Sequence, residues 1–162
     1  MPVFERGDMW SVLEKTDFFC VTTNMQYNRH GNAVMGAGMA KQAAQYWPKI
    51  AGDFGHILRR FDPSFDNMCS LIGAYPINNT NQYVRILYFM VKEHWKDNAS
   101  LELIDRSSRA LAHHAYLFPE RRFDLNFPGI GNGRLRKEAV LDLLTHLPDN
   151  VHIWEYKSEE AT

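Results

Sequence analysis

Two glycine-rich segments contain the residues best suited to chemistry. The first, 31–43, reads GNAVMGAGMAKQA and places Gly36 and Gly38 before a helix-forming run; the second, 128–133, reads PGIGNG. Glycines let a backbone approach a ligand closely, and the N–H groups at a helix start attract anions. The first segment is neither a dinucleotide loop, because Lys41 replaces the third glycine, nor a triphosphate loop. Two such loops face to face would grip a diphosphate, and the plain alternative for each is a turn without a ligand.

The elements that would position these loops follow from the apolar pattern. Runs rich in β-branched and aromatic residues end at turn formers, and helical runs with apolar residues four apart lie between them. This pattern predicts a three-layer α/β/α sandwich around a mixed, roughly six-stranded sheet, in which loops at the carboxyl ends of strands line a ligand crevice. Strands are predicted at 3–6, 18–23, 69–77, 84–91, 123–127 and 151–156, and helices at 36–46, 48–60, 100–115 and 134–147.

Length and composition set limits on the kind of protein. The 162 residues, 45% of them apolar, suit one domain, predicted at 1–157 with a short frayed tail at 158–162. A net charge of −1 argues against a broad nucleic-acid-binding face. Cys20 and Cys69 lie in strand-like apolar runs without paired spacing, which predicts buried thiols in a reducing compartment. With no apolar signal segment and no run long enough to cross a bilayer, we expect a cytoplasmic protein without membrane contact. Seven histidines and two cysteines give no zinc spacing, so no metal or cofactor is expected.

Four segments carry a resemblance to a known fold. Arg6-Gly7-Asp8-Met9 and Val21-Thr22-Thr23-Asn24 end the first two strand-like runs, and Met35–Ala40 and Phe127–Gly133 contain the glycine segments. Together they resemble a macrodomain, the ADP-ribose-binding fold, over most of the chain. The resemblance implies that Asp8 binds the adenine amino group, that the N–H of Met9 contacts the ring, and that Asn24 binds the distal ribose. It implies diphosphate contacts from Met35, Gly36, Ala37 and Gly38 and from Gly129, Ile130, Gly131, Asn132 and Gly133.

The segment Val91-Lys92-Glu93-His94-Trp95 narrows the resemblance. Followed by Ser100 as a helix cap, it is similar to the macrodomain branch that removes ADP-ribose through an active-site lysine, which includes terminal ADP-ribose glycohydrolase and antitoxins that strip ADP-ribose from DNA. The resemblance implies that Lys92 is catalytic. Three features depart from the branch: residues 27–30 are inserted, Val91 replaces a threonine, and the assisting aspartate after the second glycine segment has no counterpart.

The implied reaction needs Lys92 as a neutral amine, which can form a Schiff base with the opened distal ribose. Burial at a strand end would favour that form by penalising the charged one. His94 is a candidate general acid if the strand continues that far. The plain alternatives are a solvent-facing Lys92, packing roles for His94 and Trp95, and a helix-capping role for Asp8 ahead of a short helical turn at 9–12.

Three functions remain open at this point. The leading one is an ADP-ribosyl hydrolase that removes ADP-ribose from a modified macromolecule, with DNA as the acceptor suggested by the antitoxin branch. The alternatives are an ADP-ribose 1″-phosphate phosphatase and a non-catalytic reader of ADP-ribose, which the missing aspartate favours. The partner is therefore ADP-ribose or an ADP-ribosylated macromolecule, and no stable protein partner is implied. The basic residues that flank the loops would make any contact with nucleic acid; they are Arg29, Lys41, Arg134 and Arg136.

Overall fold

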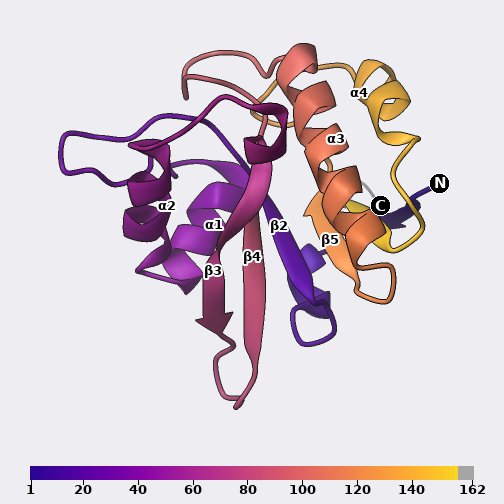
Figure 1. Cartoon of the computed structure of the whole chain (residues 1–162), viewed down its shortest axis with the longest axis horizontal. Coiled ribbons are helices and arrows are strands. Elements are labelled where there is room, and N and C mark those ends of the chain that lie inside the picture. Colours follow the sequence, from indigo (N-terminus) through magenta and orange to yellow (C-terminus); the bar gives the residue numbers. More distant parts are fainter. Residues whose placement is uncertain (157–162) are drawn as a thin grey trace.

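A six-stranded mixed sheet forms the centre of the computed structural model, which describes residues 1–156 (Figure 1). The strand order is β1-β6-β5-β2-β4-β3, and every neighbouring pair is parallel except β3 and β4, which form an antiparallel hairpin. This arrangement confirms the predicted mixed sheet. The strands are β1 (Val3–Arg6), β2 (Phe18–Thr23), β3 (Cys69–Pro76), β4 (Tyr83–Met90), β5 (Phe123–Asn126) and β6 (Val151–Glu155).

Four helices flank the sheet in two pairs, which confirms the α/β/α sandwich. In Figure 1, α1 and α2 lie on the side of β3. Helix α3 crosses in front of β5, and α4 lies to the right of α3. Two short 3-10 turns, η1 and η2, complete the regular structure. The helices are α1 (Gly38–Tyr46), α2 (Ile50–Leu58), α3 (Leu101–Leu117) and α4 (Lys137–Leu144), and the turns are η1 (Met9–Val12) and η2 (Phe65–Asn67).

Alternation along the two central strands divides the core into two apolar layers. On β4, Ile86 and Tyr88 pack with α1 and α2, while Leu87 and Phe89 pack with α3 and α4. This is the two-residue period of a strand buried on both faces. The parallel strands all point the same way, so the segments that follow β1, β2, β4, β5 and β6 meet at one edge of the sheet.

The helix predicted at 134–147 is shorter than expected. Arg134 has a φ of 60°, a left-handed backbone that cannot continue a helix, and its N–H donates to the carbonyl of Gly131. Leu135 N then donates to Gly129 O at 2.9 Å, so the chain folds back on the glycine segment before α4 begins at Lys137. The helical pattern of 134–147 is therefore interrupted by a loop closure that only the folded backbone reveals.

The other predicted bounds differ less. β4 ends at Met90, two residues before Lys92, and the predicted helices at 36–46 and 48–60 begin at Gly38 and Ile50. The tail predicted at 158–162 lies outside the described residues. Within residues 1–156, no helix combines the length and the apolar character that crossing a bilayer requires.

Candidate functional site

An elongated cleft of about 1020 Å³ runs along the carboxyl edge of the parallel strands. Its walls come from the segments after β1, β2, β4 and β5, from the end of β6, and from the start of α1. Asp8, after β1, and Lys92, after β4, both line it. Strands β1 and β4 are four inter-strand spacings apart, about 19 Å, so the cleft suits a long, narrow ligand.

The structure brings together nearly all the residues that the sequence singled out. Met35 is the exception: it is buried in the core layer under α1 and α2 and is not among the residues that line the cleft. Those at the cleft are Asp8, Met9, Asn24, Gly36, Ala37, Gly38, Lys92, Gly129, Ile130, Gly131, Asn132 and Gly133.

The first glycine loop (residues 36–38) ends at the start of α1. Ala37 is the N-cap residue and provides no side-chain hydrogen bond to the helix start, so the first backbone N–H groups of α1 face the cleft without a protein cap. A Cβ placed on Gly36 would meet nothing within 4 Å, so packing within the protein does not explain a glycine there. The space beside Gly36 belongs to the cleft.

The second glycine loop (residues 128–133) contains glycines of two kinds. A Cβ on Gly133 would lie 2.5 Å from the carbonyl oxygen of Gly129, and one on Gly129 would lie 2.6 Å from Cδ1 of Ile104. These two glycines are required by packing. A Cβ on Gly131, in contrast, would meet nothing within 4 Å. Gly131 therefore matches Gly36: each leaves open space at the cleft.

The two loops meet across the cleft. Gly38 has a φ of 56°, and a Cβ placed there would lie 3.2 Å from Nδ2 of Asn132. Both loops line this region of the cleft, and no basic side chain occurs among residues 36–38 or 128–133, so an anion bound there would be held by backbone N–H groups. Such a backbone cradle attracts an anion of the size of a diphosphate.

Asp8 does cap the short helical turn η1. Trp10 N donates to Oδ1 of Asp8 at 3.0 Å, and Ser11 Oγ donates to the Asp8 carbonyl at 2.7 Å. The capping alternative is confirmed, and the same side chain lines the cleft. Three aromatic residues missed by the sequence analysis, Trp10, Trp154 and Tyr156, line the cleft with it.

Several solved structures share this architecture. DarTG from Thermosipho africanus in complex with ADP-ribose matches with a TM-score of 0.74 at 20% identity, over 97% of this chain and 42% of that longer chain. The macrodomains of DarG from Mycobacterium tuberculosis and Thermus aquaticus match with TM-scores of 0.71 and 0.72, both at 22% identity, over 98% of this chain and 99% of theirs. This chain has the macrodomain fold. No protein-family model and no curated protein matches its sequence.

At the β4 end of the macrodomain cleft, Lys92 lies on a loop rather than on a strand. Its half-buried side chain donates from Nζ to the carbonyl oxygens of Trp95 at 3.4 Å and Asp97 at 3.2 Å. His94 is not among the cleft residues, and its Nδ1 accepts from Lys96 N. Because the strand stops at Met90, the geometry that would make His94 a general acid is absent.

Trp95 differs from its expected packing role. Its side chain is 54% exposed, and it lines the cleft beside Lys92. The indole faces His94, with ring centroids 6.0 Å apart, and Lys96 Nζ lies 5.8 Å from its centroid. No sequence signal distinguishes an exposed tryptophan from a buried one here, because the loop has no period.

Asn24 lies at the base of a hairpin that contains residues 27–30. Its Nδ2 donates to Val34 O at 3.0 Å, and its Oδ1 accepts from Gln26 N at 2.9 Å. The amide therefore closes the hairpin while it lines the cleft. On the neighbouring strand ends, Asn126 donates to Thr22 Oγ1 at 2.7 Å, and both of these cleft residues were missed from sequence.

Carboxylates are scarce in the cleft. Among the described residues that line it, only Asp8 and Glu155 carry one, both at the β1–β6 end, and Glu155 is paired with Lys137 at 2.6 Å. The acidic partner missing from the sequence after the second glycine loop is thus not replaced by another segment within residues 1–156. No cluster of metal-binding side chains occurs in that range either.

Proposed function

We propose that this macrodomain binds ADP-ribose in the cleft and cleaves the bond between ADP-ribose and a macromolecule, with Lys92 as the catalytic residue. The observation that carries the proposal is the pair of open glycines, Gly36 and Gly131, on two loops that meet over the cleft. A diphosphate fits a cradle of backbone N–H groups with room on both sides. The similar DarTG structure holds ADP-ribose, which supports the same ligand here.

The residues at the two ends of the cleft favour one orientation of the bound ADP-ribose. The adenine lies at the Asp8 end, where Trp10 and Trp154 offer aromatic surfaces and Asp8 retains a carboxylate oxygen, Oδ2, beside its helix cap. The distal ribose lies at the other end, between Asn24 and Lys92. The diphosphate then spans the glycine loops between them.

Two carbonyl oxygens hold the Nζ of Lys92 in place at the cleft. A neutral amine has two hydrogens and one lone pair, so donation to Trp95 O and Asp97 O leaves the lone pair free. Nζ attacks C1″ of the distal ribose in its opened form, and the acceptor departs with a proton as a Schiff base forms. Water then adds to C1″ and releases ADP-ribose, and Lys92 regains its amine.

A non-catalytic reader is the second candidate. The observation that favours it is the lack of a carboxylate beside Lys92 among the described cleft residues, because protonation of the leaving group has no evident donor there.

The acceptor to test first is DNA, following the resemblance of the Lys92 segment to the antitoxin branch. Both cysteines are buried and unpaired, which accords with a reaction in the reducing cytoplasm.

Two measurements test the proposal. Calorimetric titration with ADP-ribose and with ADP should give clearly tighter binding of ADP-ribose, because only ADP-ribose fills the Asn24–Lys92 end. ADP-ribosylated DNA is then incubated with wild type, Lys92→Ala and Lys15→Ala, the last altering an exposed lysine after η1 that does not line the cleft.

Lys92→Ala should lose turnover by at least about a hundredfold and keep its affinity for ADP-ribose, while Lys15→Ala keeps both. Wild-type turnover by Lys92→Ala would eliminate the lysine mechanism. Tight binding without turnover by the wild type would establish the reader instead. No binding at millimolar ADP-ribose would remove both functions.

A further inference from the structure

The insertion that distinguishes this chain forms a hairpin at residues 25–34, next to the distal-ribose end of the cleft. Tyr27 and Ala33 form an antiparallel bridge, Val34 N donates to Gln26 O at 2.9 Å, and the tip turns at Asn28. The side chain of Asn28 accepts from His30 N at 2.9 Å and from Asn32 N at 3.1 Å. The tip is therefore a defined turn rather than a loose loop.

The hairpin is fixed to α2 and to the Lys92 loop. Ala33 N donates to Ala51 O at 2.8 Å, and a Cβ on Gly55 would overlap the carbonyl of Gly31, so the backbones of the tip and α2 are in direct contact. At its base, Met25 N donates to Glu93 O at 3.2 Å. These contacts hold the tip in a constant position relative to Lys92.

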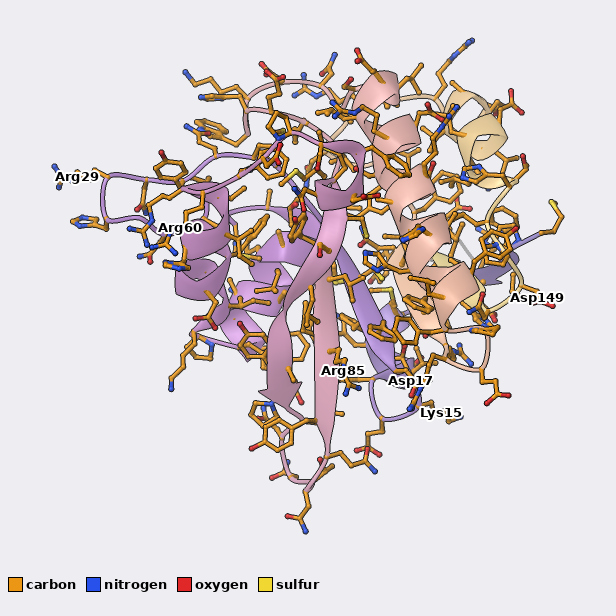
Figure 2. All side chains as sticks on the ribbon, in the orientation of Figure 1. Lys15, Asp17, Arg29, Arg60, Arg85 and Asp149 are labelled. Atoms are coloured by element: carbon orange, nitrogen blue, oxygen red, sulfur yellow. The ribbon has the colours of Figure 1, made fainter. Side chains whose placement is uncertain are left out.

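The surface formed by the hairpin and the end of α2 is basic. Arg29 and His30 at the tip and Arg59 and Arg60 after α2 are all exposed, and Figure 2 shows Arg29 and Arg60 on the same side of the molecule. Within residues 1–156, none of the three arginines forms an ion pair. The sequence contains no acidic residue between Asp17 and Asp53.

The acidic side chains that lie nearest in the sequence are already engaged. Asp53 accepts a hydrogen bond from the Tyr75 hydroxyl, and Asp62 accepts from Ser64 N at 3.2 Å. Neither carboxylate forms an ion pair with these arginines within residues 1–156, so no local salt bridge neutralises the positive charge at the tip, although the net charge of the chain is −1. A local basic surface of this kind contacts a few phosphates rather than wrapping a duplex.

The exposed Trp95 adds an aromatic surface two residues after Glu93, whose carbonyl contacts the base of the hairpin. It stands at the cleft beside Lys92, where the acceptor of a bound ADP-ribose would leave the cleft. An exposed indole stacks on an unpaired base irrespective of sequence. The same loop contains Lys92 and Lys96 as well as Glu93 and Asp97, so these charges balance, and the excess positive charge lies on the hairpin.

We propose that the hairpin 25–34, the end of α2 and Trp95 bind the single-stranded nucleic acid that carries the ADP-ribose. Arg29 and Arg60 neutralise its phosphates, and Trp95 stacks on a base next to the modified one. This inference rests on the proposed function of the cleft and names its acceptor class. It also explains why a chain of low net charge can use a nucleic acid substrate.

The test uses an unmodified single-stranded deoxyoligonucleotide of mixed sequence, with affinity measured by fluorescence anisotropy at about 50 and 200 mM salt. The variant Arg29→Glu/Arg60→Glu is chosen because neither side chain forms a hydrogen bond within residues 1–156, whereas Arg59 Nε donates to Gly55 O. The matched control, Lys15→Glu/Arg85→Glu, makes the same change in charge elsewhere on the molecule (Figure 2). Arg85 lies near the start of β4, about 17 Å along the strand from Met90, the last strand residue before the Lys92 loop.

Arg29→Glu/Arg60→Glu should lower the affinity for the oligonucleotide at least about tenfold and reduce the magnitude of the salt slope by about two, whereas the control should change neither. Trp95→Ala should lower the affinity for the single strand about tenfold and leave a duplex of the same sequence unaffected. Equal losses in the two charge variants, or no measurable affinity in the wild type, would overturn the proposal and point to a protein acceptor.

Calorimetry with free ADP-ribose on the same proteins separates this proposal from the function of the cleft. Retained ADP-ribose affinity in Arg29→Glu/Arg60→Glu would show that its cleft is intact. A wild type that binds the oligonucleotide through the hairpin but not ADP-ribose would contradict the proposed function and leave the nucleic-acid surface standing. A wild type that binds ADP-ribose but not the oligonucleotide would contradict the nucleic-acid surface and leave the proposed function standing.

Discussion

Asn132 of the second glycine loop lies directly beside Gly38, the first residue of α1. A Cβ on Gly38 would come within 3.2 Å of Asn132 Nδ2, and the φ of 56° at Gly38 already disfavours any other residue. This contact joins two loops that are about 90 positions apart in the chain. The cleft depends on it, because each loop alone offers only one side of an anion cradle.

Alanine at the two open glycines should separate ligand binding from stability. Gly36→Ala and Gly131→Ala add a methyl group that meets nothing in the protein, so the free energy of unfolding should change by less than about 1 kcal/mol. The methyl group occupies the space that we assign to the diphosphate, and ADP-ribose affinity should fall at least about tenfold. Urea denaturation and calorimetry measure the two quantities.

Gly133→Ala provides the contrast for that prediction. Its Cβ would lie 2.5 Å from the Gly129 carbonyl oxygen, so this variant should lose roughly 1–3 kcal/mol of stability. Unchanged ADP-ribose affinity in both Gly36→Ala and Gly131→Ala would mean that the open space beside these glycines is not the ligand site.

The attachment of the hairpin to α2 predicts opposite effects for two glycines of one helix. A Cβ on Gly55 would overlap the Gly31 carbonyl, so Gly55→Ala should destabilise the protein by about 3 kcal/mol or displace the hairpin. A Cβ on Gly52 would lie 3.5 Å from Oδ1 of Asn32, an ordinary contact, so Gly52→Ala should stabilise α2 by roughly 0.5–1 kcal/mol. Urea denaturation of both variants checks the pair, and similar effects at the two positions would show that the hairpin does not rest on Gly55.

Stability should fall at alkaline pH because of two buried thiols. Burial raises the pKa of Cys69 above its ordinary value of 9.0, and burial together with nearby Cys69 and Asp124 raises that of Cys20. Above pH 9 the unfolded chain releases these protons while the folded chain keeps them, so the free energy of unfolding decreases as the pH rises. Below about pH 8 the two thiols contribute no pH dependence.

Denaturation at a series of pH values from 7 to about 9.5 measures this effect. For two thiols with an ordinary pKa of 9.0, the slope reaches about 2 kcal/mol per pH unit at pH 9.5. The variant Cys20→Ala/Cys69→Ala should flatten the curve, whatever its stability at pH 7. A slope that survives in this variant would assign the alkaline loss to other groups, such as the buried hydroxyl of Tyr88, whose pKa burial also raises.

The sequence by itself determined the elements whose signals are local. Strands β1 and β2 begin and end where the sequence predicts them, because alternation and β-branched residues act within a few positions. Asp8 and Ser100 cap the helical segments that follow them, as predicted, because a capping side chain reaches only two or three residues ahead. The resemblance of short motifs was enough to select the macrodomain fold and most of the cleft residues.

Contacts between distant segments could be decided only by the tertiary structure. The sequence cannot show that Asn132 meets Gly38, that Gly31 rests on Gly55, or that Lys92 is held by carbonyls of its own loop. The exposure of Trp95, the burial of Met35 and the loop closure at Arg134 likewise depend on what packs against them. All of these features escape prediction from the sequence for the same physical reason. Loop conformation is set by hydrogen bonds and steric contacts with neighbours far along the chain, for which a local pattern carries no signal.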